Sequence, residues 1–252
     1  MSVTPIRALY FAGFGNVPEL HAQVVKEAFP TITPTHFHAV PYWEPDYTDG
    51  FLESRVKQRA RDLANIARSD RILLIGSSMG GRIATEMALE LRAAGRKVAL
   101  ILLSPIASAS DVSLLYRRFR FTPAAVMAVV MKYAGARWLS GLDPAERPRV
   151  KLYYDACDAI PWRIKQQQLE YIARAAAPIR GSLAGIYTFA MYVTQDPIVR
   201  ASSMPQYLGA GKRVTICIVK AEGHIDLVEK PQVWAKRLAP AADWLHSLGL
   251  NK

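Results

Sequence analysis

The feature that most constrains this chain is a Gly-x-Ser-x-Gly motif centred on Ser78. The apolar residues 72–75 before it are typical of a buried strand, and a helical pattern starts directly after it. In such a turn the serine side chain projects above the sheet edge, while Gly76 and Gly80 keep Cβ atoms out of the turn. The backbone N–H of Met79 then points to where a negatively charged oxygen would form. A tight strand–helix turn without chemistry is the alternative.

The rest of the chain alternates between strand-like and helix-like segments. Strands are expected at residues 6–11, 35–40, 71–75, 97–104, 186–193 and 213–220. Helices are expected at residues 18–29, 50–68, 83–95 and 231–248. Because this alternation is typical of a mainly parallel sheet covered on both faces, the sequence predicts an α/β fold with about six strands.

The alternation breaks between residues 107 and 180. This stretch is helical in pattern, at residues 112–116, 124–133 and 161–175, and prolines punctuate it. We therefore predict a single α/β core formed by residues 1–106 and 181–252, with residues 107–180 inserted as a helical cap. A chain of 252 residues is long enough for one such domain.

Three candidate reactive residues each follow a predicted strand, namely Ser78, Asp196 and His224. The carboxyl ends of parallel strands meet at one edge of a sheet, so these side chains are expected to lie together. A serine hydroxyl needs a neutral imidazole to take its proton, and that imidazole needs a carboxylate on its other nitrogen. The alternatives are a simple Asp-Pro turn at Asp196, an exposed loop histidine at His224, and Glu222 as the acid.

The order Ser, Asp, His and the motifs around these residues resemble those of the α/β-hydrolase superfamily. The matching pieces are residues 76–81, residues 196–199 and residues 223–224, and the resemblance covers nearly the whole chain outside the cap. It implies a catalytic triad of Ser78, Asp196 and His224 on a nucleophile elbow.

The loop at residues 12–15 occupies the position of the family's oxyanion loop. The resemblance therefore implies that the backbone N–H groups of Phe14 and Met79 form the oxyanion hole. Ala12 stands where the family often has histidine, so the contacts that support this loop must differ.

The resemblance implies a serine hydrolase that cleaves a carboxylic ester or thioester through an acyl-enzyme on Ser78. The acyl group is expected to be medium-sized and apolar or aromatic. Some members of the same fold are ligand receptors, lyases or cofactor-free haloperoxidases and perhydrolases, so a non-hydrolytic role is the alternative. No cofactor and no metal are expected, because the sequence has no metal-ligand cluster and no dinucleotide fingerprint.

Aromatic and apolar residues of two segments are candidates for the substrate pocket. Tyr42 and Trp43 come from an aromatic-rich loop, and Met127, Met131 and Trp138 come from the predicted cap. For the cap residues the alternative is a small core of the cap itself.

The basic character of the chain is concentrated in the predicted cap. The net charge is +11, and residues 107–180 carry 12 basic and 6 acidic side chains. Arg117, Arg118 and Arg120 lie beside Phe119 and Phe121. A solvated helix face, a docking site for an acidic substrate or acidic acyl carrier protein, and a nucleic-acid site are the three interpretations. Nucleic acid is not expected, because no nucleic-acid motif accompanies the cluster.

The sequence also bears on location. The amino terminus has no apolar signal core, and the longest apolar run, residues 123–131, is too short to span a bilayer. The only two cysteines, Cys157 and Cys217, suit a reducing compartment. We therefore expect a cytoplasmic protein that acts on a small molecule and has no membrane partner.

Overall fold

The computed structural model describes residues 6–30, 32, 34–42, 53–66, 71–176, 183–200, 208, 213–222, 224 and 231–248. At its centre, these residues form a six-stranded sheet in the order β2-β1-β3-β4-β5-β6, in which every neighbouring pair is parallel. The strands are β1 (Arg7–Phe11), β2 (Phe37–Ala39), β3 (Arg71–Ser77), β4 (Lys97–Leu103), β5 (Tyr187–Gln195) and β6 (Val214–Glu222). The predicted α/β class, the parallel sheet and the six strands are confirmed.

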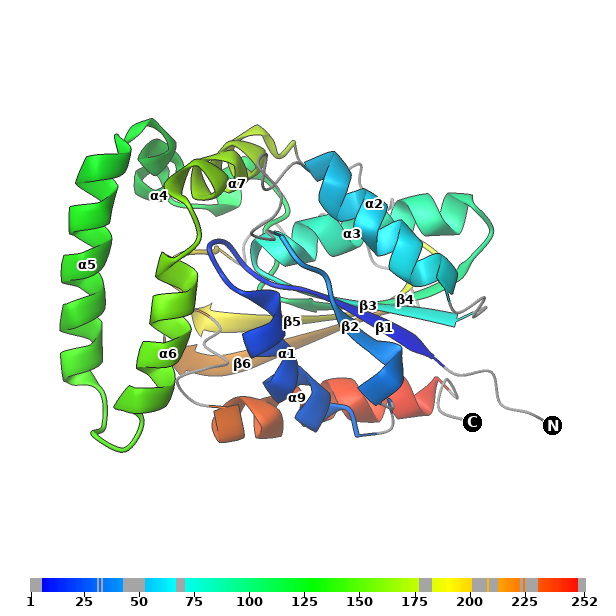
Figure 1. The fold of residues 1–252 in the computed structure, drawn as a ribbon. Coiled ribbons are helices and arrows are strands. Elements are labelled where there is room, and N and C mark those ends of the chain that lie inside the picture. The colour runs from blue at the N-terminus through cyan, green and yellow to red at the C-terminus, as the bar shows by residue number, and fades with distance from the viewer. Residues whose placement is uncertain are drawn as a thin grey trace.

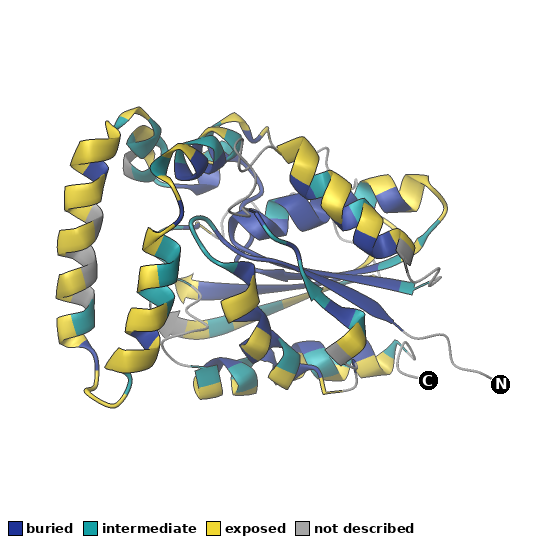
Figure 2. Cartoon of the chain, viewed as in Figure 1, coloured by how far each residue is buried: buried dark blue, intermediate teal, exposed yellow. Residues whose placement is uncertain are grey.

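Helices cover both faces of this sheet (Figure 1). On one face lie α1 (Pro18–Ala28) and α9 (Pro231–Ser247), and on the other lie α2 (Glu53–Ile66) and α3 (Met79–Ala93). The strands of such a sheet are shielded on both sides, which explains why β3 and β4 are apolar at nearly every position. Figure 2 shows the sheet as the most buried layer of the molecule.

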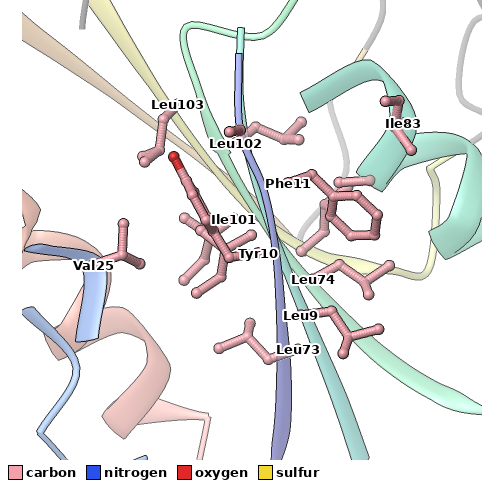
Figure 3. Packing of buried hydrophobic residues seen from close by; sticks show 14 of the residues in the cluster. Leu9, Tyr10, Phe11, Val25, Leu73, Leu74, Ile83, Ile101, Leu102 and Leu103 are labelled. Atoms are coloured by element: carbon pink, nitrogen blue, oxygen red, sulfur yellow. The ribbon is translucent and has the colours of Figure 1, made fainter. Parts of the chain in front are cut away.

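The side chains of β1 alternate between the two layers of the core (Figure 3). Leu9 and Phe11 point towards Ile83 of α3, whereas Tyr10 points to the side of Val25 of α1. All five are buried and belong to one hydrophobic cluster. The strand is therefore fixed from both faces immediately before the loop that follows it.

Between β4 and β5 the described chain is helical. Its helices are α4 (Leu114–Arg118), α5 (Ala124–Gly141), α6 (Arg147–Asp158) and α7 (Trp162–Arg174), with 3-10 turns at Ala109–Asp111 and Phe119–Phe121. We call residues 107–176 the helical segment, and it stands at the carboxyl end of the sheet, at the left of Figure 1. The sequence pattern did not predict α6 because prolines punctuate this stretch. Pro148 lies in the first turn of α6, where its missing N–H is not needed.

The helical segment leaves and rejoins the core at one place. Arg82 of α3 donates from a single nitrogen, Nη1, to the carbonyl oxygens of Ala107 and Ala176, both at 2.7 Å. Nearby, the N–H of Ala109 donates to the carbonyl oxygen of Ala175 at 2.9 Å. The two ends of the segment are thus tied to each other and to the helix that follows Ser78.

The bounds of several elements differ from expectation. The strand predicted at residues 35–40 covers only Phe37–Ala39, because Pro34–His36 form a 3-10 turn. The helix predicted at residues 124–133 continues to Gly141. Among the described residues, no helix is long and apolar enough to cross a membrane.

Candidate active site

Ser78 occupies the sharp turn between β3 and α3 in an unfavourable backbone conformation. Its φ is 51° and its ψ is −120°, a region that residues with a Cβ atom rarely adopt. Hydrogen bonds to β4 and to the residues that follow β4 fix this backbone. The N–H of Ser78 donates to the carbonyl of Leu103 at 2.9 Å, and the N–H of Ile106 donates to the carbonyl of Ser78 at 3.1 Å. The neighbouring chain therefore holds the serine in its strained position.

The two motif glycines allow the close packing that this turn requires. A Cβ atom on Gly76 would lie 2.4 Å from the carbonyl oxygen of Gly80. A Cβ atom on Gly80 would lie 2.2 Å from the carbonyl oxygen of Phe11, at the end of β1. Both distances are far below a van der Waals contact, so the α3 helix reaches the sheet only because these side chains are absent.

Asp196 and His224 lie together at the same sheet edge. Asp196 follows β5, and its buried carboxylate accepts the Nδ1–H of His224 on Oδ2 at 2.6 Å. Its Oδ1 accepts the N–H groups of Ile198 and Val199, each at 2.9 Å. A carboxylate only accepts, so the proton of the imidazole lies on Nδ1 and Nε2 is left as a base. The side chain of Glu222, the alternative acid, lies outside the described part of the structure.

The loop after β1 lies against Ser78. A Cβ atom on Gly13 would be 3.3 Å from the Cβ of Ser78, so the backbone of the following residue, Phe14, is close to the serine. Met79 is the first residue of α3, where the N–H has no acceptor within the helix and the helix dipole favours negative charge. In the described residues the N–H of Phe14 makes no backbone hydrogen bond.

Tyr42, which was predicted to line a pocket wall, is buried in the core cluster. It is 3% exposed, and its hydroxyl donates to the carbonyl oxygen of Ala12 at 2.6 Å. The reason is the path of the chain: the N–H of Val40 donates to the carbonyl of Tyr10, which lays the residues after β2 alongside β1. Tyr42 thereby supports the loop that contains Ala12.

The helical segment also holds this loop. The N–H of Gly15 donates to Oε1 of Gln168 on α7 at 2.8 Å, and Gln168 is fully buried. The hydroxyl of Tyr153 on α6 donates to Oδ1 of Asn16. The loop after β1 is therefore supported from the core and from the helical segment together.

Of the other predicted pocket residues, only Met127 has a side chain that the structure describes. Trp43 lies outside the described residues, and so do the side chains of Met131 and Trp138. Met127 is 3% exposed and lies outside the main core cluster, as do Leu142, Val150 and Leu169 of the helical segment. Other buried apolar residues of the segment belong to that cluster, namely Val112, Ile160, Ile164 and Ile172. The burial of Met127 agrees with the alternative of a small core within the helical segment. Four large hydrophobic residues of α5 are exposed, as Figure 2 indicates for much of that helix: Val126, Val129, Val130 and Tyr133.

Sequence reasoning missed His21 as a neighbour of the site. This buried residue of α1 hydrogen-bonds through Nδ1 with the hydroxyl of Tyr10 at 3.2 Å, and its ring stacks on Tyr153 at 5.1 Å. Burial, with a smaller contribution from the charge of His224, lowers the pKa of His21 to about 3. Its spacing of three and four residues before Val24 and Val25 was a signal that it faces the core.

We expect His21 to make the protein sensitive to acid. In the unfolded chain its pKa is about 6.5, whereas in the folded protein burial keeps the imidazole neutral down to about pH 3. The contribution of His21 to the free energy of unfolding is therefore fully present above pH 6.5 and is lost as the pH falls towards 3. Between pH 7.5 and 4.5 this loss is about 2–3 kcal/mol. His21→Gln should remove it, as measured by urea unfolding at both pH values. The exposed His246 offers a matched control, since His246→Gln should keep the wild-type pH dependence. An unchanged pH dependence in His21→Gln would contradict this account.

Three further side chains lie near the site, and only the backbone N–H of Phe14 among these residues was predicted to take part in it. Phe14 lies in the loop after β1, and Ile198 lies two residues after Asp196. Tyr116 on α4 is also close to Asp196, since burial and the charge of that carboxylate raise the pKa of its hydroxyl. All three are half-buried and pack against the core with part of their surface still accessible. Apolar and aromatic side chains therefore lie around the edge of the sheet near Asp196.

A comparison with models of protein families finds a match for this chain. Residues 11–237 match the model of the alpha/beta hydrolase family, which is most of the sequence. The chain therefore belongs to the alpha/beta hydrolase family, as the motifs around Ser78 and His224 predicted. A sequence search of curated proteins finds no match.

Solved structures share the fold over almost the whole chain. The enol-lactonase from Burkholderia xenovorans LB400 is 15% identical, with a TM-score of 0.69 over 97% of this chain and 92% of that chain. The RedJ thioesterase of prodiginine biosynthesis in Streptomyces coelicolor is 17% identical, with a TM-score of 0.67 over 96% and 91%. A meta-cleavage product hydrolase from Pseudomonas fluorescens IP01 is 12% identical, with a TM-score of 0.67 over 97% and 91%. At these identities the likeness is one of fold.

Proposed function

We propose that this protein is a serine hydrolase that cleaves a carboxylic ester or thioester through an acyl-enzyme on Ser78. The observation that carries the proposal is the 2.6 Å contact between His224 and Asp196, at the sheet edge where Ser78 occupies its strained turn. The three residue types, in this order, meet the requirements of nucleophilic acyl transfer. Hydrolytic activity is also typical of the alpha/beta hydrolase family.

In the proposed reaction, Nε2 of His224 accepts the hydroxyl proton of Ser78 as Oγ attacks the acyl carbonyl carbon. The carbonyl oxygen becomes an oxyanion, which accepts hydrogen bonds from the N–H groups of Phe14 and Met79. His224 then returns the proton to the leaving alcohol or thiol as its bond to the acyl carbon breaks. Asp196 stays ionised and stabilises the imidazolium. Water then attacks the acyl carbon while His224 takes its proton. The bond between the acyl carbon and Oγ of Ser78 breaks, and His224 returns the proton to Oγ as the acid leaves.

We propose a medium-sized apolar or aromatic acyl group as the substrate. Phe14, Tyr116 and Ile198 support this choice, because they surround the sheet edge with half-buried apolar surface. We further propose that the helical segment acts as the cap of the site. In support, Gln168 and Tyr153 of that segment contact the loop that carries Phe14.

The proposal is tested by hydrolysis of a matched oxygen ester and thioester of octanoic acid. Wild-type protein should turn over many equivalents of at least one of them, with a burst of leaving group that indicates an acyl-enzyme. The ratio of the two rates then identifies the preferred leaving group. A ligand receptor of the same fold would instead show turnover near background and a large ligand-induced rise in Tm. That result, or release of a product other than the free acid, would overturn the hydrolase proposal.

We further propose that the acyl group can be delivered as a thioester of an acidic acyl carrier protein, which would dock on the basic side chains of Arg117, Arg118 and Arg120. No carboxylate pairs with Arg117, Arg118 or Arg120 in the described structure, and Phe121 beside them is 73% exposed. Changing the three arginines to glutamate should lower kcat/KM on an acyl carrier thioester about tenfold at low salt, and added salt should lower it for the wild type. The same triple variant should hydrolyse a small thioester at the wild-type rate. Equal turnover of the carrier substrate by both proteins would exclude this docking.

A further inference from the structure

A second concave site lies at the opposite end of the sheet from Ser78. It is a cavity of about 350 Å³ lined by residues at the beginnings of β3, β4, β5 and β6, near the right of Figure 1. The proposed catalytic residues all follow the carboxyl ends of strands, so this cavity is separate from them. Its volume is in the range of pockets that hold small molecules.

Five basic side chains line this cavity, and none of the described residues in its lining is acidic. They are Arg71, Arg92, Arg96, Lys97 and Arg213. Arg71 and Lys97 are register partners on neighbouring strands, an arrangement in which like charges repel. Among the described residues no carboxylate lies within ion-pair distance of Arg92, Lys97 or Arg213. Such a concentration of positive charge in a concave surface favours a compact anion.

Two of the guanidinium groups are held in place by the turn before β5. Arg213 donates from Nη1 to the carbonyl oxygen of Gly185 at 2.8 Å, and its guanidinium lies over the ring of Tyr187 at 4.9 Å. Arg92 donates to the carbonyl oxygen of Ala184. Gly185 has a φ of +89°, and a Cβ atom there would lie 2.8 Å from Nη2 of Arg92. Each guanidinium carries five N–H donors, so one bond to a carbonyl leaves most of them for a ligand.

We propose that this basic cavity binds a small molecule that carries two or more adjacent phosphate groups. Each phosphate offers several acceptor oxygens, and planar guanidinium groups bind them in pairs. A di- or triphosphate also concentrates several negative charges in a volume that the cavity can enclose. A nucleic-acid duplex or a membrane surface cannot enter a cavity of this size, which argues for a small molecule. Both a nucleoside diphosphate and an inorganic oligophosphate present this chemistry.

The test is isothermal titration of the full chain with ADP, inorganic tripolyphosphate, citrate and sulfate at matched ionic strength. Saturable 1:1 binding of tripolyphosphate that citrate and sulfate do not match would support the proposal. Stronger binding of ADP than of tripolyphosphate identifies a nucleotide as the source of the phosphates, and the reverse identifies an oligophosphate. Absence of saturable binding, or equal binding of citrate, would overturn it.

Two variants locate the site. Arg213→Gln and Lys97→Gln each remove one positive charge from the cavity and should weaken tripolyphosphate binding about tenfold. Lys132→Gln removes the same charge from the exposed surface of α5, far along the chain from the cavity, and should leave binding unchanged. Equal weakening by all three variants would reveal a bulk charge effect and reject the site. Ser78→Ala should bind tripolyphosphate as the wild type does, so this proposal and the hydrolase proposal fail independently.

Discussion

Replacing Ser78 by alanine is expected to lower kcat/KM for hydrolysis by at least about 10⁴-fold. The hydroxyl is the proposed nucleophile, and no other group can take its place in the turn between β3 and α3. Alanine at this position keeps the same φ of 51° and the same backbone hydrogen bonds, so the fold should persist. Steady-state kinetics on the octanoyl ester or thioester, combined with thermal unfolding, measures both effects.

The adjacent Ser77 is a matched control. Its Oγ lies 3.1 Å from the hydroxyl of Tyr10 in the core, so Ser77→Ala should cost about 1 kcal/mol of stability and retain activity. Ser78→Gly should be inactive and more stable than the wild type by about 1 kcal/mol, because glycine accepts a positive φ without strain. Substantial turnover by Ser78→Ala would disprove the nucleophile assignment.

Replacing Gly80 by alanine is expected to damage both the fold and the activity. The added Cβ would lie 2.2 Å from the carbonyl oxygen of Phe11 and 2.3 Å from that of Ala12. Both are backbone atoms, so α3 must move away from β1 and from the loop that carries Phe14. We expect a loss of about 3 kcal/mol in the free energy of unfolding, and a fall in kcat of at least about tenfold from the displaced oxyanion donor.

Gly141 provides the control for this substitution. It is the last residue of α5, and a Cβ atom there would meet nothing within 4 Å. Gly141→Ala should therefore leave activity unchanged and shift stability by less than about 1 kcal/mol, in the stabilising direction. Denaturant unfolding and the same hydrolysis assay compare the two variants. Wild-type stability in Gly80→Ala would show that the α3–β1 contact adapts more easily than this geometry allows.

The sequence predicted the parts of this protein that depend on local pattern. An apolar run before Ser78 and a helical pattern after it are enough to place the turn, because few other structures satisfy both. The regular alternation of strands and helices similarly predicts the parallel sheet, and the contact between Asp196 and His224 joins two of the residues that the pattern selected. The catalytic roles of these residues stay predictions.

The contacts of the helical segment could not be predicted in this way. The sequence placed Tyr42 in an aromatic-rich loop, but it gave no sign that the hydroxyl of Tyr42 donates to the carbonyl oxygen of Ala12. The contact between Gln168 and Gly15 joins positions 153 residues apart, and no local periodicity encodes such a pair. His21 likewise became visible as a neighbour of the site only when α1 and α6 were placed against each other.

The contacts of Arg82 bear on how this fold can be remodelled. Because one nitrogen atom of Arg82 binds both Ala107 and Ala176, the segment begins and ends at neighbouring points in space. The residues between them can therefore be exchanged for a shorter or different set of helices without stretching the chain across the sheet. Arg82 itself lies only four residues after Ser78, in the first turn of α3. A graft at this junction would change what surrounds the nucleophile while the strands that hold it keep their sequence and their register.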